Sequence, residues 1–364
     1  AVGQLRNAGA TPAAAIPATM QVVACEADGG TRLEMRRVPA PAAGEMLLEL
    51  VCCGLCGTDL FKLATASVAD GTVLGHEIVG RVRALGDGVR GFEPGERVVV
   101  PHHVACGSCA LCRRGSTTQC EVFRENLLEP GGFAGYVLVR PRAVAAAVWR
   151  VPTHVSDDAA VFLEPAACVL RGIDGAQMPD RDGCAVVLGG GSMGLLHLLV
   201  LRALDPRCHV VVCDPVAERR ELATQLGAAA AVPVDDGVLA DAVGALSGAL
   251  GADAVFDTVG GAAPLNQGLG VLRPGGAVVL FAHAPAGERA AFELNPMFKT
   301  ERRVVATYSG ALDEQRRIAE MLADGRLDPS VLVTHRLRLA RFDEAVDLAN
   351  ERRALKVLLH PEAV

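Results

Sequence analysis

The sequence predicts an α/β protein of two domains, one rich in short β-strands and one built on a doubly wound parallel sheet. The chain has 364 residues, more than the about 250–300 at which a single hydrophobic core stops growing. Up to about residue 150, short half-buried strands are separated by Gly and Pro turns. From about residue 157, helices and apolar strands alternate, which predicts a parallel sheet covered by helices on both faces.

Runs of apolar and β-branched residues, bounded by turn residues, mark the individual elements. In the β-rich part the expected strands are Met46 to Cys53, Glu77 to Leu85 and Arg97 to Val100. In the second part we expect strands over Cys184 to Leu188, His209 to Cys213, Ala252 to Asp257 and Ala277 to Phe281, and helices over Ser192 to Leu204 and Ala217 to Leu226. The last stretch adds strands near Val304 and Val331, a helix near Asp343 to Glu351 and a strand over Leu355 to Leu359.

These patterns divide the chain into a β-rich domain of residues 20–156 and 297–364 and a second domain of residues 157–296. The first domain is expected to be discontinuous because part of the final stretch returns to it. Residues 1–19 are expected to be a disordered extension, since two prolines interrupt their Ala-rich sequence.

Charge and composition exclude several classes of partner. The formal net charge is -7 and the pI is about 5.8, which argues against nucleic acid, because binding it depends on Lys and Arg meeting phosphates. No apolar run approaches the roughly 18 residues that cross a bilayer, so no membrane association is expected. The start of the chain lacks a signal-peptide pattern, and the expected location is therefore the cytoplasm.

Four of the twelve cysteines are clustered in one short segment: Cys106, Cys109, Cys112 and Cys120. Four thiolates in one loop form the closed tetrahedral shell of a structural zinc site, which leaves no position for a substrate. An iron–sulfur cluster is the main alternative, because bacterial ferredoxins also begin with cysteines at two-residue intervals. In that pattern the fourth cysteine follows sooner and precedes Pro, so zinc is favoured here.

A second group of metal-binding residue types lies around Cys56. The segment Cys56-Gly-Thr-Asp59 is followed by the pair His76-Glu77. A thiolate, an imidazole and a carboxylate form the mixed, incompletely filled set that a catalytic zinc requires, since one position must stay open for the reacting oxygen. Taken singly, each piece is more typical of a buried core thiol or a surface pair.

The loop after the strand Cys184 to Leu188 carries the glycine pattern of dinucleotide binding. It reads Gly189-Gly-Gly191-Ser192-Met193-Gly194 and opens a long apolar helix. The glycines let the backbone turn tightly and approach a pyrophosphate, and the helix N-terminus offers N–H donors. Asp214 ends the next strand, where a carboxylate accepts hydrogen bonds from ribose hydroxyls and repels a 2′-phosphate. NAD is therefore favoured over NADP.

The order of these motifs resembles that of the zinc-dependent medium-chain dehydrogenase/reductase family, in its alcohol and polyol (sorbitol/threonine dehydrogenase-like) branch. The resemblance covers nearly the whole chain after Met20, including the terminal strand Lys356-Val-Leu-Leu. It implies a discontinuous GroES-like catalytic domain, a Rossmann cofactor domain, and one catalytic and one structural zinc per subunit. The implied ligands of the catalytic zinc are Cys56, His76 and Glu164, with Glu77 alternating with water on the metal.

The resemblance also implies roles for residues around the metal. Asp59 would hold the second ring nitrogen of His76, Thr58 would carry the substrate's hydroxyl proton, and Arg219 would contact the adenosine ribose. The chain departs from the family at Phe61, where many members place a histidine that passes the proton to solvent. Proton exit must use another route, such as water leaving past Thr58.

The expected function is hydride transfer between NAD and a secondary alcohol or polyol, or the matching carbonyl compound, in a homodimer or homotetramer. Two alternatives stay open: a biosynthetic carbonyl or imine reductase using NAD(P)H, and a non-catalytic nucleotide-binding relative. Three cysteines near the motifs, Cys52, Cys53 and Cys168, are interpreted as buried core thiols. The pair His102 and His103 receives no assignment, because it could line a pocket or cap a loop.

Overall fold

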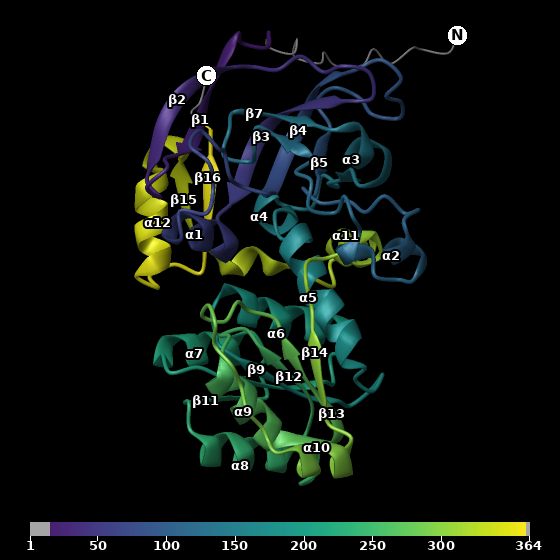
Figure 1. Ribbon diagram of the computed structural model, residues 1–364, viewed down its shortest axis with the longest axis vertical. Coiled ribbons are helices and arrows are strands. Elements are labelled where there is room, and N and C mark those ends of the chain that lie inside the picture. The colour runs from purple at the N-terminus through teal and green to yellow at the C-terminus, as the bar shows by residue number, and fades with distance from the viewer. Residues whose placement is uncertain (1–14, 362–364) are drawn as a thin grey trace, which may run out of the picture.

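The computed structural model describes residues 15–361, which form two halves, each built around its own β-sheet (Figure 1). The lower half contains a six-stranded, wholly parallel sheet in the order β11-β10-β9-β12-β13-β14. Its strands are β9 (Cys184–Leu188), β10 (His209–Cys213), β11 (Ala230–Val232), β12 (Ala252–Asp257), β13 (Leu272–Leu280) and β14 (Arg303–Ala306). This is the strand order of a doubly wound dinucleotide-binding sheet, and it confirms the predicted fold class.

The central strand β9 is buried on both faces, which explains its unbroken apolar sequence. Ala185 and Val187 pack in one core with residues of α5 and α6, whereas Val186 and Leu188 pack in another with residues of α8 and α9. The helices of this half are α5 (Leu163–Ala176), α6 (Ser192–Leu204), α7 (Ala217–Gln225), α8 (Asp236–Ser247), α9 (Ala262–Val271), α10 (Leu294–Thr300) and α11 (Leu312–Ala323).

The upper half contains an eight-stranded sheet whose main path is β15-β16-β3-β4-β5-β8, with β7 and β6 joined to it through β3. The strands are β3 (Met46–Gly54), β4 (Glu77–Leu85), β5 (Arg97–Val99), β6 (Leu128–Glu129), β7 (Tyr136–Val139), β8 (Trp149–Arg150), β15 (Val333–Arg338) and β16 (Lys356–His360). A two-stranded sheet, β1 (Thr19–Cys25) and β2 (Thr31–Arg37), and the helices α1 (Gly57–Ala64), α2 (Ala110–Arg113), α3 (Pro141–Ala146), α4 (Asp157–Ala160) and α12 (Phe342–Asn350) complete it.

The last strand of the chain pairs with a strand of the first half. Strand β16 pairs antiparallel with β3, with Leu359 opposite Cys53, and the yellow C-terminal elements lie beside the purple and blue strands in Figure 1. This pairing matters for function because it brings Lys356, the first residue of β16, next to the segment that follows β3.

The second predicted boundary, at residue 297, does not match the sheet pairing. Strand β14 pairs with β13 in the six-stranded sheet, and α11 packs against α5. The apolar pattern near residue 304 is compatible with a strand in either sheet, so the sequence alone could not assign this strand to one of the two halves. We therefore propose that the return to the first half occurs after α11. Of the expected extension 1–19, residues 1–14 lie outside the described residues, and β1 already begins at Thr19.

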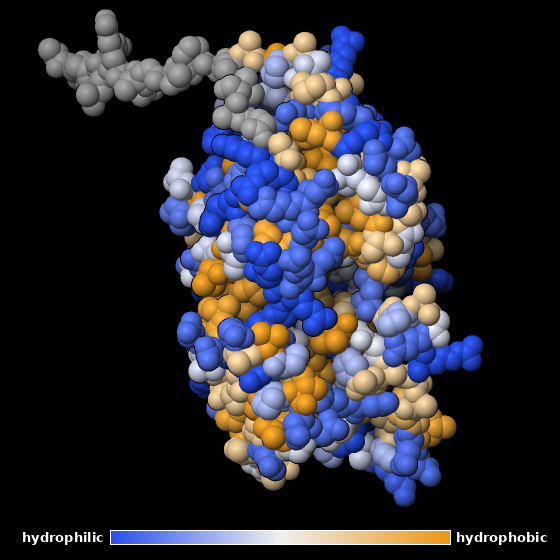
Figure 2. All heavy atoms as spheres, turned by 90° about the vertical axis from the view of Figure 1, so that its left-hand side faces the viewer, coloured by the Kyte–Doolittle hydropathy of each residue, from blue (hydrophilic) through white to orange (hydrophobic). Residues whose placement is uncertain are grey.

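Several predicted elements have the bounds that the structure shows, among them β4, β9, β10, β12 and α6. Strand β13 begins earlier than expected, at Leu272, because Leu272 pairs with Ala252 before a register shift that spans Pro274 and Gly275, which interrupt the apolar pattern. Within residues 15–361, none of the helices has the length and apolarity needed to cross a membrane. On the face shown in Figure 2, hydrophobic side chains are visible at the level where the two halves meet.

Candidate active site and metal centres

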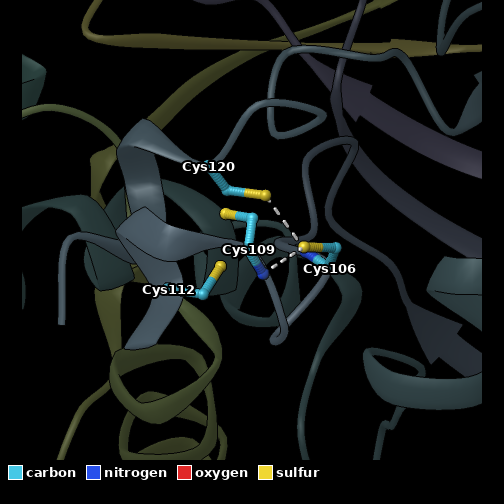
Figure 3. A group of neighbouring side chains, drawn as sticks. All are labelled: Cys106, Cys109, Cys112 and Cys120. Atoms are coloured by element: carbon cyan, nitrogen blue, oxygen red, sulfur yellow. Dashed lines mark hydrogen bonds between the residues drawn. The ribbon is translucent and has the colours of Figure 1, made fainter. Parts of the chain in front are cut away.

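The four clustered cysteines converge in a loop around α2 (Figure 3). Their sulfur atoms all lie within 4.8 Å of one another, and no cysteine of the described chain forms a disulfide. Backbone N–H groups of Ser108 and Cys109 donate to Cys106 Sγ at 3.4 and 3.3 Å, and that of Cys106 donates to Cys120 Sγ at 3.3 Å. The hydrogen bonds from Ser108 and Cys109 lower the pKa of Cys106 to about 6. Four converging sulfur atoms, with backbone N–H donors that favour the thiolate of Cys106, fit a closed zinc site.

A second cluster lies where α1 and β4 begin. Cys56 is the N-cap residue of α1, and its Sγ accepts a 3.5 Å hydrogen bond from the N–H of Thr58. His76 ends the loop before β4, and Glu77 is the first residue of that strand. One potential ligand atom from each of Cys56, His76 and Glu77 lies within 4.8 Å of the other two. The structure thus brings together three of the four residues that were predicted to bind the catalytic metal.

Asp59 is fully buried in the first turn of α1, next to His76. Its Oδ1 lies 3.4 Å from His76 Nδ1, as an ion pair rather than an aligned hydrogen bond, and its Oδ2 accepts the N–H of Cys56 at 3.1 Å. Burial alone would raise the pKa of Asp59, but the charge of His76 lowers it below its ordinary value. A carboxylate at Nδ1 orients the imidazole and leaves Nε2 as the nitrogen for a metal.

Lys356 is a residue of this site that the sequence analysis did not recognise. Its Nζ lies 2.6 and 2.9 Å from the two carboxylate oxygens of Glu77, and it also donates to Leu55 O at 3.4 Å. It is the only buried Lys or Arg side chain among residues 15–361, at 3% exposure. Burial alone would lower the pKa of Lys356, but the charge of Glu77 raises it. The feature of the sequence that could have indicated it is a lysine at the start of an otherwise apolar strand. Binding of a metal by Glu77 requires its ion pair with Lys356 to open.

Glu164 lies outside the set of three that the described residues form. It is buried in the first turn of α5, and its Oε1 accepts a 3.6 Å hydrogen bond from Cys168 Sγ. Burial raises the pKa of the Glu164 carboxyl, although the charge of nearby His76 acts against this. Ligation of a metal by Glu164 would require one of its carboxylate oxygens to move closer to Cys56 and His76. Cys168, predicted to be a core thiol without a role, is therefore a partner of a site residue.

The buried charges of this region do not balance. Three buried carboxylates, of Asp59, Glu77 and Glu164, lie near two basic side chains: Lys356 pairs with Glu77, and the ring of His76 contacts Asp59. Among the described residues Glu164 is hydrogen-bonded to Cys168 and forms no ion pair, and an unpaired charge is costly away from water, so an ionised Glu164 favours a bound cation. The donors present, which are a thiol, an imidazole and carboxylates, are those that zinc selects. On this observation the residues fit a catalytic zinc.

A cavity of about 1070 Å³ joins both halves of the molecule. One wall is formed by the segment after β3, including Cys56 and Gly57, and the other by the loop between β9 and α6. Ligands of doubly wound sheets bind at this place, beyond the carboxyl ends of the strands. A dinucleotide can thus reach the sheet and the Cys56 cluster at once.

The glycine loop has the close packing that the predicted cofactor requires. Gly189 has φ +96°, and a Cβ on Gly194 would lie 1.8 Å from Gly189 O, so the helix and the strand approach as only glycine allows. The Ser192 hydroxyl, at the start of α6, is buried without a hydrogen-bond partner among the described residues. An unsatisfied donor beside a helix N-terminus fits a phosphate of a dinucleotide.

Asp214 connects the end of β10 to this loop. Its Oδ2 accepts the N–H of Gly190 at 2.7 Å, and its Oδ1 accepts that of Val216 at 2.8 Å. Arg219 Nη1 lies 3.8 Å from Asp214 Oδ2. Asp214, Arg219, Gly189, Gly191, Ser192, Met193 and Gly194 all line the cavity, so the structure brings together the residues that were predicted to bind the cofactor.

Aromatic and histidine rings border the metal cluster. Phe61 stacks on the ring of His283, which follows β13, with centroids 5.0 Å apart and planes 4° apart. On the other side, the rings of His76, His102 and His103 follow one another at 4.5 and 3.6 Å. Burial lowers the pKa of His102 well below its ordinary value and that of His103 to about 4. His102 and His103, left unassigned from the sequence, are therefore neutral neighbours of a candidate ligand.

Two family models match separate parts of the chain. Residues 42–152 match the alcohol dehydrogenase GroES-like domain, and residues 180–324 match the zinc-binding dehydrogenase domain. The first match contains the cysteine loop together with Cys56, His76 and Glu77, and the second contains the glycine loop and Asp214.

Similar proteins extend over nearly the whole chain. An L-threonine 3-dehydrogenase of Anaeromyxobacter sp. (strain K) is 31% identical over 331 residues, which are 88% of this chain and 93% of the relative. The alcohol dehydrogenase of Thermus sp. ATN1 has a similar structure, with a TM-score of 0.80, 28% identity, and coverage of 94% of this chain and 100% of that one. A structure from Sinorhizobium meliloti 1021, described as a zinc-binding dehydrogenase and bound to NADP, has a TM-score of 0.83, 27% identity, and coverage of 95% and 100%.

Replacing Cys112 with Ser should remove one zinc per subunit and lower the melting temperature, because a closed tetrahedral site needs all four thiolates. Elemental analysis and thermal unfolding measure the two effects, and Cys208→Ser, a buried thiol outside the cluster, is the control that keeps the zinc content. A brown protein that contains iron in place of zinc would contradict the assignment.

Replacing Lys356 with Met should lower the free energy of unfolding by about 3 kcal/mol, because Glu77 would keep a buried charge without its partner. Urea unfolding measures the loss. The matched control is the double variant Glu77→Gln with Lys356→Met, which should recover part of the stability because no charge is then stranded. A double variant no more stable than Lys356→Met would show that the ion pair is not the reason.

Proposed function

The chain belongs to the zinc-dependent medium-chain dehydrogenase/reductase family, and on this premise we propose that it oxidises a secondary alcohol or polyol with NAD. The observation that carries the proposal is the cavity that joins the Cys56 cluster to the glycine loop. Hydride transfer needs the alcohol carbon and the nicotinamide ring in contact, and a cleft between two halves holds both partners in one geometry.

The residues of the chain have separate tasks in this proposal. When bound, zinc supplies a Lewis acid that favours loss of the hydroxyl proton, and NAD accepts the hydride. Cys56, His76 and Glu164 would hold the metal, with Glu77 as an alternating ligand once it leaves Lys356. Asp59 would keep the His76 ring oriented through the 3.4 Å contact at Nδ1.

The proton of the substrate needs an acceptor and an exit. We assign the first transfer to the Thr58 hydroxyl, because Thr58 lies in the first turn of α1, two residues after Cys56. Phe61 cannot carry a proton, and its ring stacks on that of His283 from the other half. The proton would therefore leave through water beside Thr58, and Phe61 would shape the pocket.

The proposed cofactor is NAD rather than NADP. Asp214 is buried at the end of β10, where its carboxylate disfavours a 2′-phosphate. Arg220 does not pair with the Asp214 carboxylate, since its Nη1 donates instead to the backbone oxygens of Asp214 and Pro215 at 2.8 and 2.9 Å.

A panel of polyols, secondary alcohols and amino alcohols, L-threonine among them, tests the reaction through the rate of NADH formation. We expect at least one secondary alcohol to be oxidised, faster with NAD than with NADP, and the activity to vanish when both zinc ions are chelated. Reduction of carbonyl compounds or imines without measurable alcohol oxidation would support the alternative of a biosynthetic reductase. No reaction in either direction would support a non-catalytic nucleotide-binding protein.

Thr58→Val should lower kcat for alcohol oxidation by about 100-fold or more, because the side chain keeps its shape and loses its proton carrier. Phe61→Ala is the matched comparison on the same helix and should change the order of preferred substrates with a smaller effect on kcat. Steady-state kinetics on the best substrates of the panel measures both. Near-normal turnover in Thr58→Val would dismiss the proton route.

A further inference from the structure

Arg352 has an unusual backbone conformation at the end of α12. Its φ is +59°, in the left-handed region that side chains other than Gly and Asn rarely adopt. Helices commonly end in this conformation, but a glycine normally occupies the position. An arginine there suggests that its side chain has a function that offsets the strain.

The side chain of Arg352 lines the cavity between the two halves. Three basic residues border this cavity, and two of them are already engaged. Lys356 pairs with Glu77, and Arg219 lies against Asp214. Among residues 15–361, no hydrogen bond or ion pair involves the guanidinium of Arg352, which is exposed. The cavity therefore has one positive group available to a ligand.

The surroundings of Arg352 indicate where it would meet that ligand. Arg219 Nη2 donates to the backbone oxygen of Arg352 at 3.4 Å, and a Cβ on Gly191 would lie 3.9 Å from Arg219 Nη1. Arg219 thus connects Arg352 to the glycine loop and to Asp214. The group that an arginine fork matches best, and that the proposed cofactor presents at this loop, is a phosphate.

We propose that Arg352 binds a phosphate group of the nicotinamide dinucleotide from the half opposite the glycine loop. The inference rests on the proposed function, because it assumes that the dinucleotide occupies this cavity. The phosphate can belong to the pyrophosphate, which NAD and NADP share, or to the 2′-phosphate of NADP. Since α12 and β16 belong to the upper half, the contact would join the two halves when the cofactor binds.

The substitution Arg352→Gly removes the side chain that would bind the phosphate without disturbing the fold, so an effect on binding can be told from an effect on stability. Glycine adopts φ +59° without strain, so this variant should melt at or above the temperature of the wild type. Arg352→Asn is a second variant that tolerates the same conformation. The control is Arg353→Gln, which removes the neighbouring charge. Arg353 pairs with Glu351 at 2.8 Å and is 66% exposed in its side chain.

Titration of the zinc-loaded protein with NADH and NADPH, followed by fluorescence or calorimetry, measures the effect without any substrate. We expect Arg352→Gly and Arg352→Asn to weaken binding about tenfold, the usual effect of losing one charge-assisted contact, and Arg353→Gln to leave it unchanged. Equal loss for both nucleotides assigns the contact to the pyrophosphate, and loss for NADPH alone assigns it to the 2′-phosphate.

Two results would overturn the inference, and they are distinguishable. Wild-type affinity in both Arg352 variants, when the wild type itself binds either nucleotide, removes the role of Arg352 and leaves the proposed function intact. A wild-type protein that binds neither nucleotide removes the proposed function and this inference with it.

Discussion

The arrangement of buried charge around Cys56 constrains the rest of the structure. Near Cys56, three buried carboxylates lie with the ammonium of Lys356 and the imidazole of His76, and each unpaired charge away from water is unfavourable by several kcal/mol. Two contacts pair buried carboxylates with basic side chains: the ion pair between Lys356 and Glu77 and the contact of Asp59 with His76. The remaining negative charge is what a dication beside Cys56 would balance.

The return of the chain to its first sheet serves this arrangement. Pairing of β16 with β3 places Lys356 against Glu77 at the start of β4, and the end of α12 places Arg352 at the cavity. The six-stranded sheet contributes the glycine loop and Asp214 from the opposite side. The cavity is therefore a product of long-range pairing, and neither half has the complete set of residues.

Elements with an unambiguous sequence pattern could be predicted. Features that depend on contacts between residues far apart in the sequence could not. Strand β9 and helix α6 were predicted with their bounds because burial on both faces gives an unbroken apolar run and a glycine loop fixes the start of the helix. Strand β14 was placed with the first half, whereas it pairs with β13 in the six-stranded sheet, because an apolar edge strand has the same sequence pattern in either sheet. The ion pair of Lys356 and the hydrogen bond between Cys168 and Glu164 depend on side-chain positions that residue spacing does not encode. The left-handed backbone of Arg352 has no sequence signal, since the expected glycine is missing.

We infer that a metal ion lies between Cys56 and His76, facing the cofactor loop. An anomalous difference map from a crystal of the zinc-loaded protein, collected at the zinc absorption edge, tests it most directly. We expect two peaks per subunit, one among the four clustered cysteines and one bonded to Cys56 and His76 with a carboxylate of Glu164 or Glu77. A single peak, confined to the four cysteines in crystals of active enzyme, would contradict it.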